Sequence, residues 1–141
     1  MSINLTRAEM ISTLTTWMKD WNAHDLESVM ALFDEDAIFI AWTGSQIASK
    51  RAIRYAWTSW FTNHQNFTFK VDEILVDEVA QKATISWTLT WPSQEPKYKG
   101  QIEQREGIDY LEFSNRLIVK KQTFSQTVLL INNESILLQA N

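Results

Sequence analysis

The hydrophobic period of this chain changes at about residue 66. Before that point, apolar residues recur three to four positions apart, which is the spacing of one helix face. After it, apolar and polar residues alternate, most cleanly from Ala83 to Trp91, where Thr and Ser occupy the intervening positions. Helices followed by a run of strands predict an α+β fold, in which the helices cover one face of a curved antiparallel sheet.

The first part of the chain predicts three helices. Thr6 and Glu9 form a capping box at the start of the first helix. Asp25 can cap a short second helix that forms a hairpin with the first, and the third begins near Ser49. The apolar run over residues 37–42 is short and rich in Ile and aromatic residues, so it predicts a strand before the third helix.

The alternating part of the chain predicts a meander of antiparallel strands. Asn115 and Arg116 form a tight turn between the last two of them. The tail, residues 127–141, contains two apolar clusters whose pattern does not distinguish strand from helix. The strands are expected near residues 67–72, 83–91, 100–113 and 117–126.

The back of this sheet is expected to have mixed polarity. The Thr and Ser residues of strand 83–91 share the outer face with Ile108 and Tyr110 of the next strand. Such a surface suits self-association, so we expect a homodimer through the outer face of the sheet.

Composition and charge exclude several classes of function. The 141 residues, 45% of them hydrophobic, predict a single domain over residues 1–141. The chain has no cysteine, its two histidines lie forty positions apart, and its three glycines cannot build a nucleotide-binding turn, so we expect neither metal nor cofactor. The net charge of −4 disfavours nucleic acid. No apolar run approaches the roughly 20 residues that cross a bilayer, and no signal peptide is recognisable, so we expect no membrane association and a cytoplasmic location.

Three parts of the sequence carry a family resemblance. The first part is the run WNAHDL at 21–26, followed by Phe33 and Asp36-Ala37. The second is the end of the third helix, with Trp57, Trp60 and Phe61. The third runs from Arg105 through Gly107-Ile108-Asp109-Tyr110 to Phe113 and continues after a turn with Leu117-Ile118-Val119. Together they resemble the nuclear transport factor 2-like superfamily, in particular its SnoaL-like, polyketide cyclase-like branch. The resemblance implies a cone-shaped fold with three N-terminal helices packed on a curved antiparallel sheet, usually dimeric through the back of the sheet.

Asp109 is the sharpest candidate for a catalytic residue. It shares a strand face with Gly107, Leu111 and Phe113, so a carboxylate stands among apolar residues beside a glycine that leaves room for a ligand. Apolar surroundings favour the neutral acid, which can move a proton or donate a hydrogen bond to an enolate. The resemblance implies a general acid/base at this place in cyclase-like members and a protonated oxyanion donor in ketosteroid isomerase-like members. The alternative is a structural aspartate held by a tryptophan, a tyrosine or a backbone amide.

Other catalytic positions of the superfamily are not matched. Ala41 stands where isomerase-like members place a base aspartate, and Trp17 stands where they carry an oxyanion tyrosine. Epoxide hydrolase-like members need an arginine at the place of Gly107 and a second acid, which residues 117–126 lack. Arg105 shares the face of Asp109, but roughly 13 Å of strand separates them. A cyclase-like aldol step needs the fewest catalytic groups, because one acid/base group in a hydrophobic pocket can be enough.

The seven tryptophans are the second unusual feature. Indoles supply large apolar surfaces with an N–H donor, so they can line a pocket for a flat hydrophobic ligand. Core filling is the alternative for at least half of them, Trp21 included. The residues expected to bind the ligand are Trp17, Trp42, Trp57, Trp60, Trp87, Trp91, Leu111 and Phe113.

The remaining polar residues have structural explanations. His24 lies in the turn of the helical hairpin, and His64 is expected to interact with the last carbonyls of the third helix. Lys120 and Lys121 are expected on a solvated face, as are the basic residues of the third helix.

Two functions therefore remain open. One is a small cyclase- or isomerase-like enzyme that acts by proton transfer on a hydrophobic carbonyl compound, with Asp109 as the acid/base. The other is a noncatalytic module that binds a small hydrophobic ligand or serves as a dimeric accessory domain.

Overall fold

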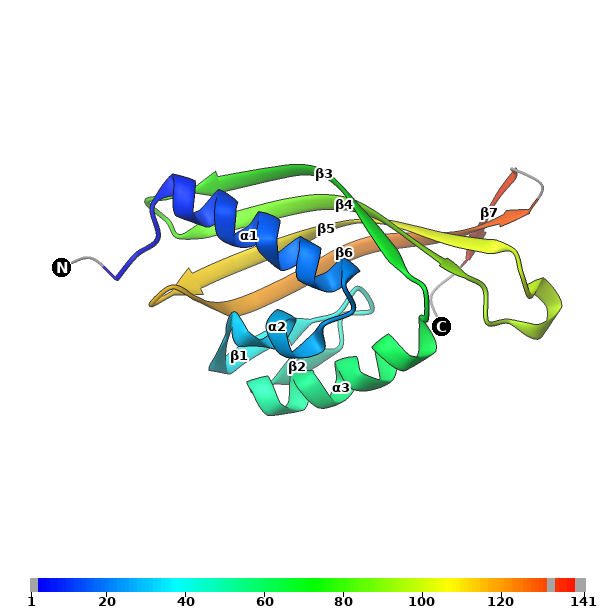
Figure 1. Cartoon of the computed structure of the whole chain (residues 1–141), viewed down its shortest axis with the longest axis horizontal. Helices are drawn as coiled ribbons and strands as arrows, with labels where there is room; N and C mark the ends of the chain where they lie inside the picture. Colours follow the sequence, from blue (N-terminus) through cyan, green and yellow to red (C-terminus); the bar gives the residue numbers. More distant parts are fainter. Residues whose placement is uncertain (1–2, 132–133, 139–141) are drawn as a thin grey trace.

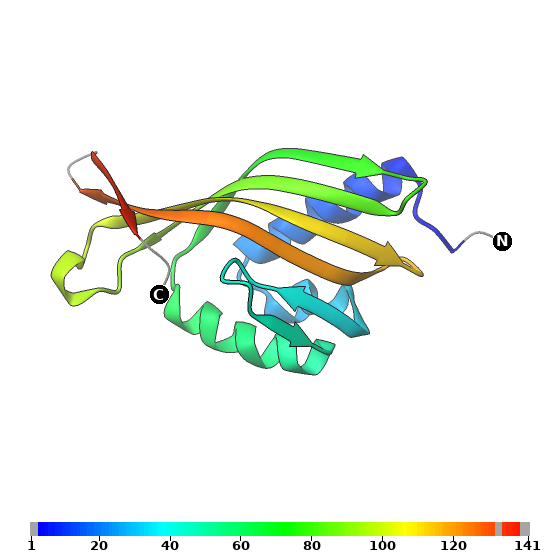
Figure 2. The same cartoon turned by 180° about the vertical axis from the view of Figure 1, so that it is seen from behind.

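The computed structural model describes residues 3–131 and 134–138 and has an α+β fold. The helices lie on one face of a curved sheet, as Figures 1 and 2 show from opposite sides. From β3 onward the regular elements of the described chain are strands, apart from the short 3-10 helix η1. The elements are α1 (Arg7–Asn22), α2 (Leu26–Ala31), β1 (Phe33–Ile40), β2 (Gln46–Ala48), α3 (Lys50–Asn63), β3 (Thr68–Asp77), β4 (Lys82–Pro92), η1 (Pro96–Tyr98), β5 (Ile102–Ser114), β6 (Leu117–Ile131) and β7 (Glu134–Leu138).

Side-chain caps fix where the helices begin. In α1, Thr6 Oγ1 accepts a hydrogen bond from the backbone of Glu9 at 3.1 Å, and the Glu9 carboxylate accepts one from the backbone of Thr6 at 3.0 Å. Asp25 and Ser49 cap α2 and α3 through their side-chain oxygens. These caps satisfy N–H groups that have no partner within the helix, and they lie where the sequence pattern places them.

The sheet has the strand order β2-β1-β6-β5-β4-β3, and β7 pairs with the far end of β6. Among the described strands, every pair is antiparallel except one: β1 runs parallel to β6, with Ile38 opposite Lys120. The expectation of a wholly antiparallel sheet is wrong at this pair. A parallel pair cannot be joined by a hairpin and needs a long crossover, which here consists of everything from β2 to β5.

A β-bulge in the β5–β6 hairpin decides which side chains face inward. Asn115 and Arg116 both have positive φ, 51° and 69°, as a two-residue type I′ turn requires. Phe113 then pairs with Ile118, but the next pair is Glu112 with Lys120, so Val119 is the extra residue. Beyond the bulge, alternate residues of β6 therefore point to the opposite face from the one that simple counting gives.

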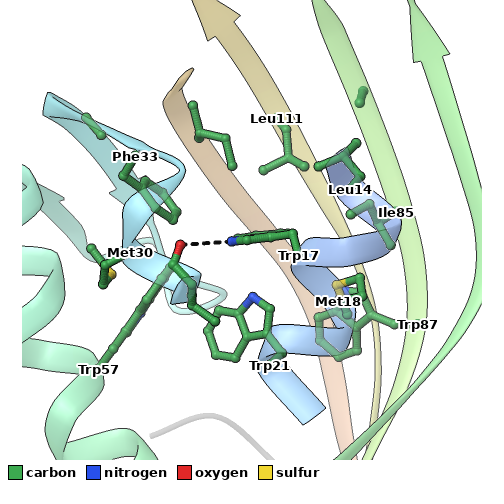
Figure 3. Packing of buried hydrophobic residues seen from close by; sticks show 14 of the residues in the cluster. Leu14, Trp17, Met18, Trp21, Met30, Phe33, Trp57, Ile85, Trp87 and Leu111 are labelled. Carbon is green, nitrogen blue, oxygen red and sulfur yellow. Dashed lines mark hydrogen bonds between the residues drawn. The ribbon is translucent and has the colours of Figure 1, made fainter. Parts of the chain in front are cut away.

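The core lies between the helices and the inner face of the sheet. Along β4 every second residue from Ala83 to Trp91 is buried, as the alternation predicts. Trp17 of α1 is nearly fully buried, and its indole Nε1 donates to the carbonyl of Val29 at 3.0 Å (Figure 3). Gly107 of β5 is covered by the ring of Trp87, since an added Cβ would lie 2.4 Å from its Cη2 atom. The space beside Asp109 at Gly107 is thus filled by an indole, and the expectation that it is left for a ligand is wrong.

The described part of the tail is strand. β6 continues to Ile131, and β7 pairs antiparallel with it, with Thr127 opposite Leu138. Residues 132–133 and 139–141 of the tail lie outside the described residues. None of the helices formed by residues 3–131 and 134–138 has the length and apolar character that crossing a bilayer needs.

Candidate active site

A cavity of about 220 Å³ lies between α1, α3 and the inner face of the sheet. Its volume is below the 300–1,000 Å³ that is usual for the sites of drug-sized ligands, so a molecule that fits it would be small. Figure 3 shows Trp21, Trp57 and Trp87 in this region, contributed by α1, α3 and β4. The residues that line the cavity are Met18, Trp21, Phe39, Ala41, Trp42, Ala56, Trp57, Trp60, Phe69, Trp87, Leu89, Arg105, Asp109, Lys121 and Thr123.

Asp109, Lys121 and Thr123 form a polar cluster in this mostly aromatic wall. Thr123 lies directly opposite Asp109 in the β5–β6 pairing, and Lys121 lies two residues before it on the same face. Thr123 Oγ1 donates to Asp109 Oδ1 at 2.7 Å, and Lys121 Nζ lies 3.1 Å from the same oxygen. Lys121 Nζ also donates to Thr123 Oγ1 at 2.7 Å. The register of two strands therefore assembles an acid, a cation and a hydroxyl within hydrogen-bond distance.

Lys121 is buried, with a side chain 7% exposed. Burial lowers the pKa of its ammonium, and the charge and hydrogen bond of Asp109 act in the opposite direction. The ammonium also lies 4.7 Å from the ring centre of Phe39 and 5.4 Å from that of Trp57, so two aromatic faces stabilise its charge. The expectation that Lys121 lies on a solvated face is wrong, because the bulge turns it inward.

One oxygen of Asp109 is available to a ligand. Lys121 and Thr123 both contact Oδ1, and Oδ2 has no donor among the described residues. Asp109 itself is 4% exposed and borders the cavity. A bound molecule can therefore meet a carboxylate oxygen and an ammonium group side by side, a combination suited to removing a proton next to a carbonyl group.

Arg105 is the second cation on the cavity wall. Its guanidinium carbon lies 5.2 Å from the ring centre of Trp42 and 5.1 Å from that of Trp91, and its Nε donates to Thr127 Oγ1 at 2.8 Å. Burial lowers the pKa of this guanidinium, while the charge of Glu103 raises it. No carboxylate of the described residues lies within 4.0 Å of it.

Two indole N–H groups near the cavity lack an acceptor in the part of the chain that the structure describes. The Nε1 atoms of Trp21 and Trp87 are buried without a hydrogen-bond acceptor among the described residues. Both residues line the cavity. A buried N–H group without an acceptor costs about 1–3 kcal/mol, so these two groups lower the stability of the fold around the cavity.

The predicted site residues divide into two groups. Asp109 and four of the predicted tryptophans, Trp42, Trp57, Trp60 and Trp87, line the cavity. The other predicted residues do not line it, and their role in binding a ligand stays a prediction. Trp17 bonds to the α2 backbone, Trp91 packs against Arg105, and Leu111 and Phe113 are buried in the core.

Several cavity residues were not among the predicted ones. Trp21, expected as core filler, both fills the core and borders the cavity. Lys121 and Thr123 follow a bulge that the sequence does not show. Phe39 falls in the strand predicted over 37–42, and in the structure its ring packs against Trp57 of α3. The sequence pattern of that strand did not show which of its faces points inward.

The histidines have structural contacts. His24, in the turn after α1, has its Nε2 at 2.9 Å from the carbonyl of Phe67. His64 Nδ1 lies 2.9 Å from the carbonyl of Trp60 at the end of α3, as expected, and its ring stacks on Trp60. Among the described residues, no group of three or more His, Asp or Glu side chains can hold a metal ion.

Comparison with known proteins places the chain in a family. The SnoaL-like domain model matches residues 14–121, so the chain belongs to the SnoaL-like family of the nuclear transport factor 2-like superfamily. No curated protein matches the chain.

Solved structures with the same fold share little sequence with it. AclR, a proposed hydroxylase from Streptomyces galilaeus, has a TM-score of 0.73 at 15% identity, covering 85% of this chain and 80% of its own. A proposed isomerase from Bacillus subtilis has a TM-score of 0.69 at 17% identity, with coverage of 82% and 84%. SalBIII, an epoxide hydrolase/cyclase-like enzyme with a role in pyran ring formation in the polyether salinomycin, has a TM-score of 0.69 at 12% identity, with coverage of 81% and 88%. At these identities the likeness concerns the fold.

Proposed function

We propose that this chain is an enzyme that binds a small hydrophobic carbonyl compound and moves a proton at the carbon next to the carbonyl group. The observation that carries the proposal is the Asp109–Lys121–Thr123 cluster on the wall of an aromatic cavity. Asp109 is the acid/base group, and Lys121 is the electrophile that the sequence alone did not indicate. The products of such a step are those of an isomerase or an aldol-type cyclase.

The charges of the cluster suit this chemistry. At the start, the carboxylate of Asp109 and the ammonium of Lys121 balance one another. Oδ2 takes a proton from the substrate carbon, and the negative charge moves to the carbonyl oxygen, where the ammonium stabilises it. Asp109 then returns the proton to another atom of the substrate. One positive and one negative charge remain adjacent throughout, so no step leaves an unpaired charge in the buried site.

Related folds support a reaction of this type. The compared structures include a cyclase-like enzyme, a proposed isomerase and a proposed hydroxylase. A proton-transfer cluster in a hydrophobic cavity can serve both a cyclase and an isomerase. We therefore favour cyclase- or isomerase-like chemistry over hydroxylation.

Exchange of α-protons tests this proposal without knowledge of the natural substrate. Indan-1-one, 2-tetralone and 4-phenylbutan-2-one are incubated with the protein in deuterium oxide, and loss of the α-proton signals is followed by proton NMR. The protein is expected to accelerate exchange of at least one ketone, and Asp109→Asn is expected to lower the rate about a hundredfold or more. Glu106→Gln is the matched control, because Glu106 lies on the same strand and is exposed.

A second pair of variants tests the role of the cation. Lys121→Met removes the ammonium from the cavity, whereas Lys120→Met removes the neighbouring one, which pairs with Glu112. Lys121→Met is expected to abolish exchange and Lys120→Met to preserve it. Exchange that persists at the wild-type rate in Asp109→Asn or Lys121→Met contradicts the proposal.

A noncatalytic ligand-binding module is the second candidate. The observation in its favour is that Oδ1 of Asp109 is fully engaged by Lys121 and Thr123, as in a structural ion pair. The two candidates differ in the NMR experiment: a binding module shifts the ketone signals without accelerating exchange.

The wider predictions about the molecule belong with this proposal. We propose one SnoaL-like domain over residues 1–141, with the cavity inside the cone expected of its superfamily, and a homodimer through the outer face of the sheet. On that face Ile108 and Phe124 lie opposite each other and are 47% and 56% exposed, which supports burial against a second copy. The cytoplasmic location stays a prediction.

A further inference from the structure

Arg105 is held in an unusual position for a cation on a cavity wall. Its guanidinium lies over the rings of both Trp42 and Trp91, and Thr127 Oγ1 accepts a hydrogen bond from Nε. A guanidinium has five N–H donors, and the four on its terminal nitrogens have no acceptor among the described residues. The group is therefore oriented and partly dehydrated while most of its hydrogen-bonding capacity is unused.

Glu103 does not form an ion pair with Arg105. Glu103 lies two residues earlier on the same face of β5, and its charge raises the pKa of Arg105. Its carboxylate nevertheless lies beyond the 4.0 Å of an ion pair. A planar guanidinium that is stacked on aromatic rings and has free terminal nitrogens is the arrangement that binds a carboxylate through two parallel hydrogen bonds.

The two polar ends of the cavity are separated by an apolar floor. Arg105 and Asp109 lie four residues apart on β5, which is roughly 13 Å between their Cα atoms. Gly107 lies between them, and the ring of Trp87 covers it. A ligand that reaches both ends must have an apolar middle.

We propose that the ligand is a hydrophobic keto acid, whose carboxylate binds Arg105 and whose carbonyl group lies beside Lys121 and Asp109. The inference rests on the proposed function, because the second half of this assignment uses the same catalytic cluster. It adds the substrate class: an anion at one end, a carbonyl at the other, and an apolar, preferably flat, body between them.

Calorimetric titration with matched probes tests the carboxylate. The probes are 4-(4-acetylphenyl)butanoate and its primary amide, in which a flat ring lies between the carbonyl and the charged or amide end; they have the same carbon skeleton and differ in charge. The wild-type protein is expected to bind the acid about tenfold or more tightly than the amide, as a hydrogen-bonded charge pair at a partly buried site implies. Arg105→Gln is expected to bind both probes with the affinity of the amide, and its unchanged affinity for the amide shows that the cavity is intact.

Two further variants make the test specific. Arg51→Gln removes a charge of the same kind from an exposed position of α3 and is expected to preserve the preference for the acid. Arg105→Lys retains the charge but lacks the planar guanidinium, so it is expected to retain only part of the preference for the acid. Equal affinities of the wild type for acid and amide overturn the inference, and so does a preference for the acid that survives in Arg105→Gln.

Failure of this inference is distinguishable from failure of the proposed function. If acid and amide bind equally, the carboxylate assignment is wrong and the ketone-binding cavity stands. If the acid binds through Arg105 but Asp109→Asn exchanges α-protons at the wild-type rate, the substrate class stands and the catalysis is wrong. If neither probe binds at millimolar concentration, the keto-acid inference is wrong, and the exchange of α-protons from the simple ketones decides the proposed function by itself.

Discussion

Gly107→Ala tests whether the indole of Trp87 is pressed against the β5 backbone. An added Cβ would lie 2.4 Å from Cη2 and 2.6 Å from Cζ2 of Trp87, and 3.0 Å from the carbonyl oxygen of Phe124. Ordinary contacts of a Cβ atom begin at 3.4 Å, so the closest overlap is about 1 Å. The Trp87 ring is 4% exposed and packs edge-on against Phe69 at 5.2 Å, so it has little room to move.

Overpacking of this kind costs about 1–3 kcal/mol, which corresponds to a fall in Tm of roughly 3–10 °C for a chain of this length. Thermal unfolding followed by circular dichroism measures it. Since Trp87 lines the cavity, a ring displaced into that space also weakens probe binding.

A double-mutant cycle identifies the cause. Trp87→Phe lacks the two benzo-ring atoms that collide, so Gly107→Ala is expected to cost clearly less in that background than in the wild type. Equal costs in both backgrounds would refute the assignment of the strain to Trp87, and an unchanged Tm in Gly107→Ala would refute the packing argument altogether.

Three other perturbations follow from single contacts. Burial, assisted by the charge of Arg105, lowers the pKa of His64 from 6.5. The unfolded chain therefore binds more protons than the folded chain below about pH 6.5, and the free energy of unfolding falls as the pH falls. Urea unfolding at pH 7.5 and pH 5 is expected to show a smaller loss of stability between the two pH values in His64→Gln than in the wild type. Gln81 bonds through its side chain to both the N–H and the carbonyl of buried Leu5, at 3.0 and 2.9 Å, so Gln81→Ala is expected to destabilise by about 1–3 kcal/mol in urea unfolding. Phe124→Lys places a charge on the proposed dimer surface, so sedimentation is expected to show monomers where the wild type forms dimers; a wild type that is itself monomeric contradicts that interface.

Local signals of the sequence predict much of this fold. The capping box at Thr6, the alternation along β4 and the turn at Asn115 each depend on residues close together in the chain, and each is present in the structure. The parallel pairing of β1 with β6 joins segments about eighty residues apart, and no local pattern encodes it. The strands were therefore predictable, whereas their order was not.

The candidate site was less predictable because one residue changes the register. Counting back from the turn at Asn115 places Gln122 opposite Asp109 and turns Lys121 outward. The bulge at Val119 shifts the pairing by one and places Thr123 there instead. Asp109 precedes the shift on its own strand and could be predicted to face inward, but its partners could not.

The cavity is walled by elements from both halves of the chain, from Met18 of α1 to Thr123 of β6. Its walls come together only when nearly the entire chain is folded, so no partly folded form retains a binding site. Any ligand then stabilises the whole molecule in proportion to the logarithm of its concentration. A rise in the melting temperature therefore reports binding in the cavity. A library of small keto acids can be screened in this way for a ligand without an assay of the reaction.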